Sequence, residues 1–129
     1  RAGELLPFIA GIEAGADLVM IGHLTVPALD DRPAPFSSAI VTELLRQELG
    51  FDGVVVTDAL EMGALGDYTS GESAVLAVQA GVDLLLCPGD PAEALRALSE
   101  AVKEGELSRE RIDESVLRIL RMKLRFSEG

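Results

Sequence analysis

The chain has 129 residues, 48% of them hydrophobic, and a formal net charge of −11. These values predict one globular domain with a single core, exclude a disordered chain, and argue against binding to nucleic acid or to an anionic membrane surface. The single cysteine, Cys87, excludes an intrachain disulfide, and no apolar run is long enough to span a bilayer.

One unit recurs three times: a helix, a glycine, an aspartate and a short apolar strand. The helices are predicted over about 3–14, 38–48 and 72–80, and the strands over about 17–22, 53–57 and 83–87. Because the strand segments are apolar throughout, we expect strands buried on both faces that pair in parallel through right-handed helical crossovers. The residues predicted to be mostly buried are Leu18, Val19, Met20, Val54, Val55, Val56, Leu84, Leu85 and Leu86.

Two further helices are predicted over about 91–104 and 109–125. Pro91 and Ser108 mark their starts, and Asp90 is expected to cap the first of them. The second half of the last helix is crowded with basic residues, which favours a solvated face over a basic binding surface. These residues are Arg118, Arg121, Lys123 and Arg125.

Two residues lie where predicted strands end. Asp58 directly follows the strand 53–57, and a carboxylate at the C-terminal tip of a buried parallel strand is where an α/β barrel places its chemistry. The residues after Asp58 also favour a helix, so on spacing alone Asp58 could instead be a helix cap. Cys87 ends an apolar run and is predicted to be a buried small hydrophobe rather than a reactive thiol.

The segment GFDGVVVTDALEM, residues 50–62, resembles the nucleophile segment of glycoside hydrolase family 3, in particular its bacterial β-N-acetylhexosaminidase branch. The resemblance continues in order through ELLPF at 4–8, AGADLVM at 14–20, His23, PALD at 27–30, AGVDLLL at 80–86 and LSRERIDESVLRIL at 107–120. It implies an α/β fold, the C-terminal part of a TIM (β/α)8-type barrel with parallel strands. About three strand–helix units and the terminal helices would be present, so residues 1–129 are expected to form part of the catalytic barrel.

The resemblance also implies site residues. Asp58 matches the nucleophile, which would attack the anomeric carbon and form a glycosyl-enzyme intermediate. His23 would line the substrate pocket, and Met62 would lie near the bound sugar unless it only fills the core. The acid/base of this branch is a histidine on a Lys-His-Phe-Pro-Gly-His-Gly type of loop, and neither that loop nor the sugar-binding arginine, aspartate and lysine has a counterpart here. The isolated chain is therefore expected to be inactive.

The partners that follow are a carbohydrate substrate, an N-acetylglucosaminide, and no nucleic acid or membrane. No P-loop, Rossmann fingerprint or His/Cys cluster occurs, so no cofactor or metal is expected. An open parallel sheet leaves an edge and a face uncovered, which predicts self-association or pairing with the missing half of the barrel. A non-catalytic self-associating half-barrel is the alternative function, whereas Asp90 at the phosphate position argues against an aldolase or isomerase barrel. The sequence leaves open which glycosidic linkage is cleaved, whether N-acetylglucosamine is preferred over glucose, and whether the protein is secreted.

Overall fold

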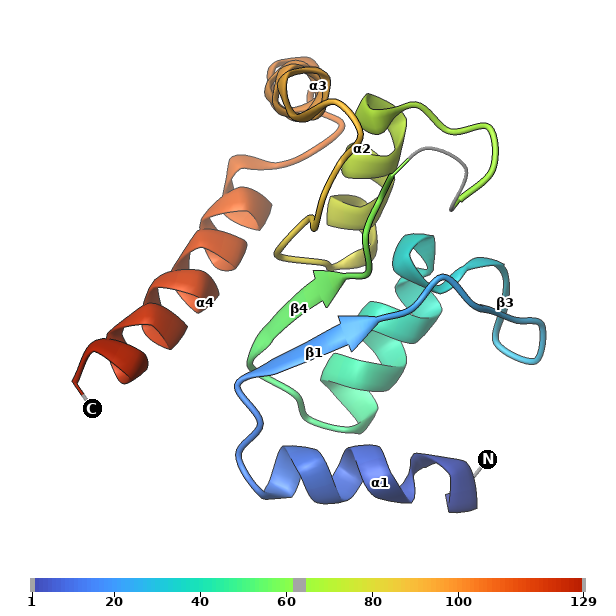
Figure 1. Cartoon of the computed structure of the whole chain (residues 1–129), viewed down its shortest axis with the longest axis vertical. Helices are drawn as coiled ribbons and strands as arrows, with labels where there is room; N and C mark the ends of the chain where they lie inside the picture. The colour runs from blue at the N-terminus through green and yellow to red at the C-terminus, as the bar shows by residue number, and fades with distance from the viewer. Residues whose placement is uncertain (1, 62–64, 129) are drawn as a thin grey trace.

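The computed structural model describes residues 2–61 and 65–128, in which short parallel strands lie beside helices (Figure 1). The elements in chain order are α1 (Ala2–Glu13), β1 (Leu18–Ile21), β2 (Thr25–Val26), β3 (Asp30–Pro33), η1 (Ala34–Phe36), η2 (Ala39–Glu48), β4 (Val54–Thr57), α2 (Ser70–Ala80), α3 (Pro91–Glu104) and α4 (Arg109–Ser127). In this described part, none of the helices combines the length and the apolar character that crossing a bilayer requires.

The predicted parallel pairing is confirmed for two strands. β1 pairs with β4 in a register that places Leu18 opposite Val54 and Ile21 opposite Thr57. The third predicted strand is reduced to one parallel bridge, between Val56 and Leu84. A side chain interrupts the ladder at its start, because the carboxylate of Asp83 accepts the Val55 N–H at 3.0 Å.

The predicted helices are all present, and their boundaries follow from their caps. Gly81 and Gly105 end α2 and α3 in the left-handed region, with φ of 116° and 81°. Asp90 and Ser108 cap α3 and α4 through their side chains, as predicted. η2 is wound as a π-helix, which sequence periodicity did not predict. The hairpin of β2 and β3 was also not predicted.

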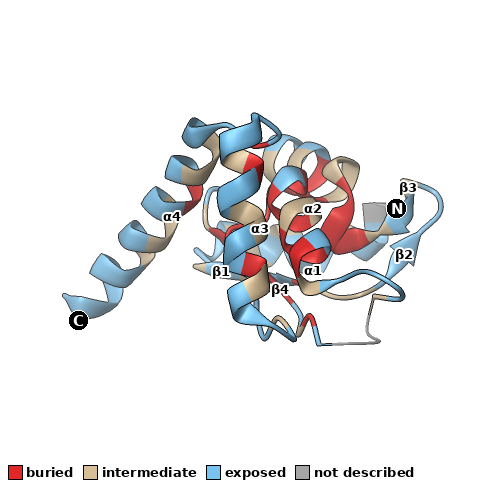
Figure 2. Cartoon of the chain, turned by 90° about the horizontal axis from the view of Figure 1, so that it is seen from above, coloured by how far each residue is buried: buried red, intermediate tan, exposed pale blue. Residues whose placement is uncertain are grey.

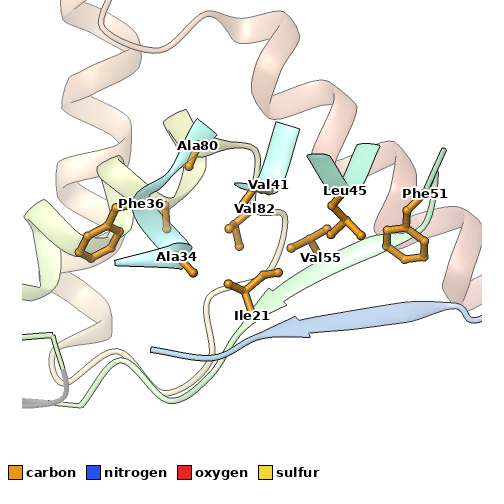
Figure 3. Packing of buried hydrophobic residues seen from close by; sticks show 10 residues of the cluster. Ile21, Ala34, Phe36, Val41, Leu45, Phe51, Val55, Ala80 and Val82 are labelled. Carbon is orange, nitrogen blue, oxygen red and sulfur yellow. The ribbon is translucent and has the colours of Figure 1, made fainter. Parts of the chain in front are cut away.

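The main core lies between one face of the two strands and the helices η2 and α2. Figure 3 shows its side chains pointing into this space. Its larger members are Ile21, Phe36, Val41, Leu45, Phe51, Val55 and Val82. Because neighbouring residues of a strand point to opposite faces, Val19 packs against this core while Leu18 and Met20 point away from it.

The burial prediction is correct for β4 and wrong for part of the rest. Val54, Val55 and Val56 are buried, and Val19, Leu84 and Leu85 are half-buried. Leu18, Met20 and Leu86 are exposed, Met20 to 51%. The apolar composition of β1 is that of a strand covered on both faces, but no element of the described chain covers its second face.

Hydrogen bonds and ion pairs connect helix α4 to the residues at the start of the strands. The fully buried carboxylate of Asp83 accepts hydrogen bonds from Arg46 Nη2 at 2.6 Å, Ser115 Oγ at 2.6 Å and Arg118 Nη1 at 3.1 Å. Arg125 forms an ion pair with Asp17. The predicted solvated basic face is therefore wrong for Arg118, whose side chain is 21% exposed, whereas Arg125 is 65% exposed as predicted. Asp17 and Asp83 stand just before their strand segments, so α4 lies along the N-terminal ends of the strands (Figure 1).

Candidate active site

Asp58 lies at the opposite edge, as the first residue after β4. Its backbone N–H donates to the carbonyl oxygen of Ile21 at 3.0 Å, which ties the residue to the end of β1. Its side chain is exposed, and Oδ1 accepts a hydrogen bond from the Ala59 N–H at 2.7 Å. The backbone is thus fixed between two strands while the carboxylate stays open to a ligand.

The helix-cap alternative for Asp58 does not hold. Residues 59–61 are not helical, and Glu61 is exposed. The next helix of the described chain, α2, begins at Ser70 and has its own cap. There the side chain of Thr69 accepts the Glu72 N–H and the Glu72 carboxylate accepts the Thr69 N–H, which is a complete capping box. Ala59 and Leu60, the apolar residues directly after Asp58, therefore belong to a connection and not to a helix.

Thr57, which sequence reasoning missed, locks the strand ends together. It is fully buried, and its Oγ1 accepts the Leu86 N–H at 3.1 Å. The Leu60 N–H in turn donates to the Leu86 carbonyl oxygen at 2.9 Å. These bonds clamp the chain on both sides of Asp58 to the third strand segment. The sequence did contain a signal for this role, namely a threonine hydroxyl directly after three consecutive valines.

His23 lies at the same edge as Asp58, because it follows β1 and β1 ends opposite Thr57. The residue is half-buried, and its Nε2 is buried with no hydrogen-bond partner among residues 2–61 and 65–128. Buried polar atoms are normally satisfied, so this nitrogen still lacks the hydrogen-bond partner that a buried imidazole usually has. Met62, the third predicted site residue, lies outside the described residues.

Asp30 belongs to the hairpin that follows His23, and its carboxylate is already engaged. It accepts Ser37 Oγ–H at 2.7 Å and the Arg32 N–H at 3.1 Å, and it lies 3.2 Å from Arg32 Nη2. The Ser37 hydrogen bond, followed by those from Arg32, lowers the pKa of Asp30 to about 2. Asp30 is therefore held ionised at neutral pH and is unsuited to donate a proton to a leaving group.

Cys87 follows the third strand segment at this edge, and its predicted burial is wrong. The thiol is exposed, and the backbone turns there with a φ of 45°. This left-handed turn takes the chain out of the sheet, which is why the apolar run ends at the surface. A non-glycine residue in this region carries backbone strain, a feature that clusters at functional sites. Nowhere in the described chain, this edge included, are three His, Cys, Asp or Glu side chains placed to hold a metal ion.

Within residues 2–61 and 65–128, the edge therefore offers a fixed, exposed carboxylate and an imidazole nitrogen without a hydrogen-bond partner. That arrangement can present a nucleophile to a bound molecule and position it. It does not by itself complete a reaction that needs a general acid.

Comparison with known proteins places this arrangement in a family. The model of the glycosyl hydrolase family 3 N terminal domain matches residues 1–122. A β-hexosaminidase of Chromobacterium violaceum is 44% identical over 92 residues, which are 70% of this chain and 26% of that protein. An uncharacterized secreted glycosyl hydrolase of Arthroderma benhamiae is 38% identical over 98% of this chain and 38% of its own length.

Solved structures share the fold. A family 3 β-N-acetylglucosaminidase from Paenibacillus sp. superposes with a TM-score of 0.90 at 49% identity, over 95% of this chain and 24% of that chain. The β-N-acetylglucosaminidase of Thermotoga maritima gives a TM-score of 0.85 at 28% identity, over 92% of this chain and 28% of its own. The α/β fold with parallel strands thus matches part of the family's barrel domain, and the chain spans less than half of these relatives. The chain belongs to glycosyl hydrolase family 3, in its β-hexosaminidase branch.

Proposed function

We propose that this chain supplies the nucleophile-bearing part of a retaining glycoside hydrolase that removes terminal β-linked N-acetylglucosamine. The observation that carries the proposal is the placement of Asp58, whose backbone is fixed to the end of β1 while its carboxylate is exposed at the C-terminal tip of a buried strand. Chemistry in α/β barrels takes place at that edge. The name of the Paenibacillus relative, at 49% identity, supports N-acetylglucosamine as the sugar.

In the proposed reaction an oxygen of the Asp58 carboxylate attacks the anomeric carbon as the glycosidic C–O bond breaks. The departing oxygen takes its proton from a general acid outside these 129 residues. Water then attacks the glycosyl ester, loses a proton to the same group acting as base, and restores the carboxylate. His23 Nε2 would bond a polar group of the sugar, since it has no hydrogen-bond partner within the described chain. Met62 is proposed to lie near the same sugar.

We further propose that residues 1–129 form only part of the catalytic barrel, its C-terminal part. The chain spans 24% of the Paenibacillus structure and 26% of the Chromobacterium relative. The apolar but exposed Leu18 and Met20 support the same view, because they occupy a strand face that a closed barrel would cover. The alternative, a non-catalytic half-barrel module, predicts that Asp58 contributes nothing to turnover in any context.

The experiment replaces the matching segment of the Paenibacillus enzyme with this chain and measures hydrolysis of an aryl N-acetylglucosaminide. Asp58→Ala in the chimera should lower kcat by about 10³-fold or more, because the covalent route is lost. Asp52→Ala is the matched control: it removes an exposed carboxylate at the other end of β4 and should leave kcat within about threefold of the parent chimera. Near-parental activity of the Asp58→Ala chimera would refute the proposed role.

A further inference from the structure

The hydrogen-bond ladder between β4 and the third strand segment changes its step at the end of β4. Before that point it is regular: the Leu84 N–H donates to the Val55 carbonyl oxygen, and the Thr57 N–H donates to the Leu84 carbonyl oxygen, both at 3.0 Å. In a parallel ladder the bonds are evenly spaced, so the bonding residues of each strand lie two apart. The regular pattern would therefore continue with the Leu86 N–H on the Thr57 carbonyl oxygen and the Ala59 N–H on the Leu86 carbonyl oxygen.

Both of these expected bonds are replaced. The Leu86 N–H donates to the side-chain hydroxyl of Thr57, at 3.1 Å, instead of to its carbonyl oxygen. The Leu86 carbonyl oxygen accepts the Leu60 N–H at 2.9 Å, one residue later than the regular pattern. On the other side of β4 the Asp58 N–H donates to the Ile21 carbonyl oxygen, which follows the register of β1 and β4. The chain thus carries one extra residue opposite the third segment only, as in a β-bulge, and bulges beside active sites re-aim side chains.

This shift frees one backbone N–H for the carboxylate of Asp58. A regular ladder would commit the Ala59 N–H to the third segment, but here it donates to Oδ1 of Asp58 at 2.7 Å. The other oxygen, Oδ2, accepts no hydrogen bond from residues 2–61 and 65–128. Because a hydrogen bond to one carboxylate oxygen restricts the rotation of the group, the second oxygen is held in one direction and stays available for attack.

We propose that Thr57 is a positioning residue for the nucleophile. Its hydroxyl takes the Leu86 N–H, the ladder shifts by one residue, and the freed Ala59 N–H orients the Asp58 carboxylate so that Oδ2 attacks the anomeric carbon. The same N–H stabilises the negative charge that returns to the carboxylate when water displaces it from the sugar. Thr57 is itself fully buried at the end of β4, a strand whose residues are all buried (Figure 2), so it does not touch the substrate. This role rests on the proposed function, because it requires Asp58 to be the nucleophile.

Removal of the Thr57 hydroxyl should return the ladder to its regular step. The Leu86 N–H loses its acceptor and would turn to the main-chain carbonyl oxygen of residue 57. The Leu86 carbonyl oxygen would then take the Ala59 N–H, and the Asp58 carboxylate would lose the donor that orients it. The rate of attack should fall while sugar binding is kept, because a misplacement of a reacting group by about 1 Å can cost about 10²-fold in rate.

The first test measures hydrolysis of the aryl N-acetylglucosaminide by the chimera with the Paenibacillus enzyme. Thr57→Val replaces the hydroxyl by a methyl group and should lower kcat about 10–100-fold, with KM within about threefold of the parent chimera. Thr57→Ser keeps the oxygen and should leave kcat within about threefold. Val55→Ala is the matched control: it removes buried volume from the same strand and destabilises the fold comparably, but it should also leave kcat within about threefold.

The second test isolates the attack itself. A fluorosugar with an activated leaving group needs no proton donor, so its rate of adduct formation depends on the carboxylate alone. Thr57→Val and Thr57→Ala, which both remove the hydroxyl, should slow adduct formation about tenfold or more. Rates are expressed per mole of enzyme finally labelled, so that unfolded molecules do not count.

Three results would overturn the positioning role: parental kcat and adduct rates in the variants without the hydroxyl, a loss confined to KM, or an equal loss of kcat in Thr57→Ser or Val55→Ala. Near-parental kcat in the Asp58→Ala chimera would instead refute the proposed function, so the two failures are distinguishable.

Discussion

Asp83→Ala should be among the most damaging single changes in this chain. The carboxylate has no exposed surface, and its four hydrogen bonds join three elements: Oδ2 to Arg46 Nη2 and the Val55 N–H, and Oδ1 to Ser115 Oγ and Arg118 Nη1. Arg111 Nη1 adds a charge at 3.8 Å. Removing one partner of a buried ion pair leaves uncompensated charge behind.

The expected cost follows from what remains in place. The side chains of Arg46 and Arg111 are only 11% and 16% exposed, so water cannot replace the lost carboxylate. Burial already lowers the pKa of Arg46, and the Asp83 charge opposes that shift. Arg46 keeps its bonds to the carbonyl oxygens of Phe51, Gly53 and Gly81, which limits the loss. Together these contacts predict a decrease of about 3–5 kcal/mol in the free energy of unfolding.

Urea denaturation followed by far-UV circular dichroism measures this decrease. Asp52→Ala provides the control, because Asp52 occupies the equivalent position before β4 but is exposed. It should cost less than about 1 kcal/mol. If Asp83→Ala unfolds at the same urea concentration as Asp52→Ala, the buried-charge argument is refuted.

Three further predictions concern other contacts. The pKa of Asp30 is lowered from 3.8 to about 2, so its stabilising contribution is present above pH 3.8 and is lost as pH falls toward 2. Asp30→Asn should therefore flatten the curve of unfolding free energy against pH in this range. An unchanged curve would contradict the hydrogen bonds assigned to Asp30. Thr57→Val should lower the free energy of unfolding by about 1–3 kcal/mol in a urea titration, because it removes the buried hydroxyl that accepts the Leu86 N–H, whereas Thr57→Ser keeps the acceptor; equal costs would argue against the clamp. Val55→Ala should cost about 1–4 kcal/mol and Met20→Ala less than about 1 kcal/mol, and the reverse order would contradict the assignment of the two strand faces.

Local signals were enough to predict much of this fold. The glycines after each helix and the caps at Asp90 and Ser108 depend on neighbouring residues only, and they were confirmed. The position of Asp58 after three consecutive valines was likewise readable, because a fully apolar run predicts a buried strand.

What the sequence did not predict depends on contacts between distant residues. Arg118 was expected in solvent, but it pairs with Asp83, which lies 35 residues away along the chain. The third strand was expected to be regular, but Asp83 takes a ladder N–H and Cys87 turns the backbone out of the sheet. The exposure of Met20 has another cause. Its side chain is apolar, as in a strand that is buried on both faces, but none of the described elements packs on the face where Met20 lies.

Trapping a covalent glycosyl-enzyme intermediate would identify the nucleophile by its position in the sequence. The chimera with the Paenibacillus enzyme would be treated with an activated fluorosugar that slows hydrolysis of the glycosyl-enzyme, then digested and analysed by mass spectrometry. We expect one sugar adduct, on the carboxylate of Asp58, and none in the Asp58→Ala chimera. An active chimera that forms its adduct on another residue would refute Asp58 as the nucleophile.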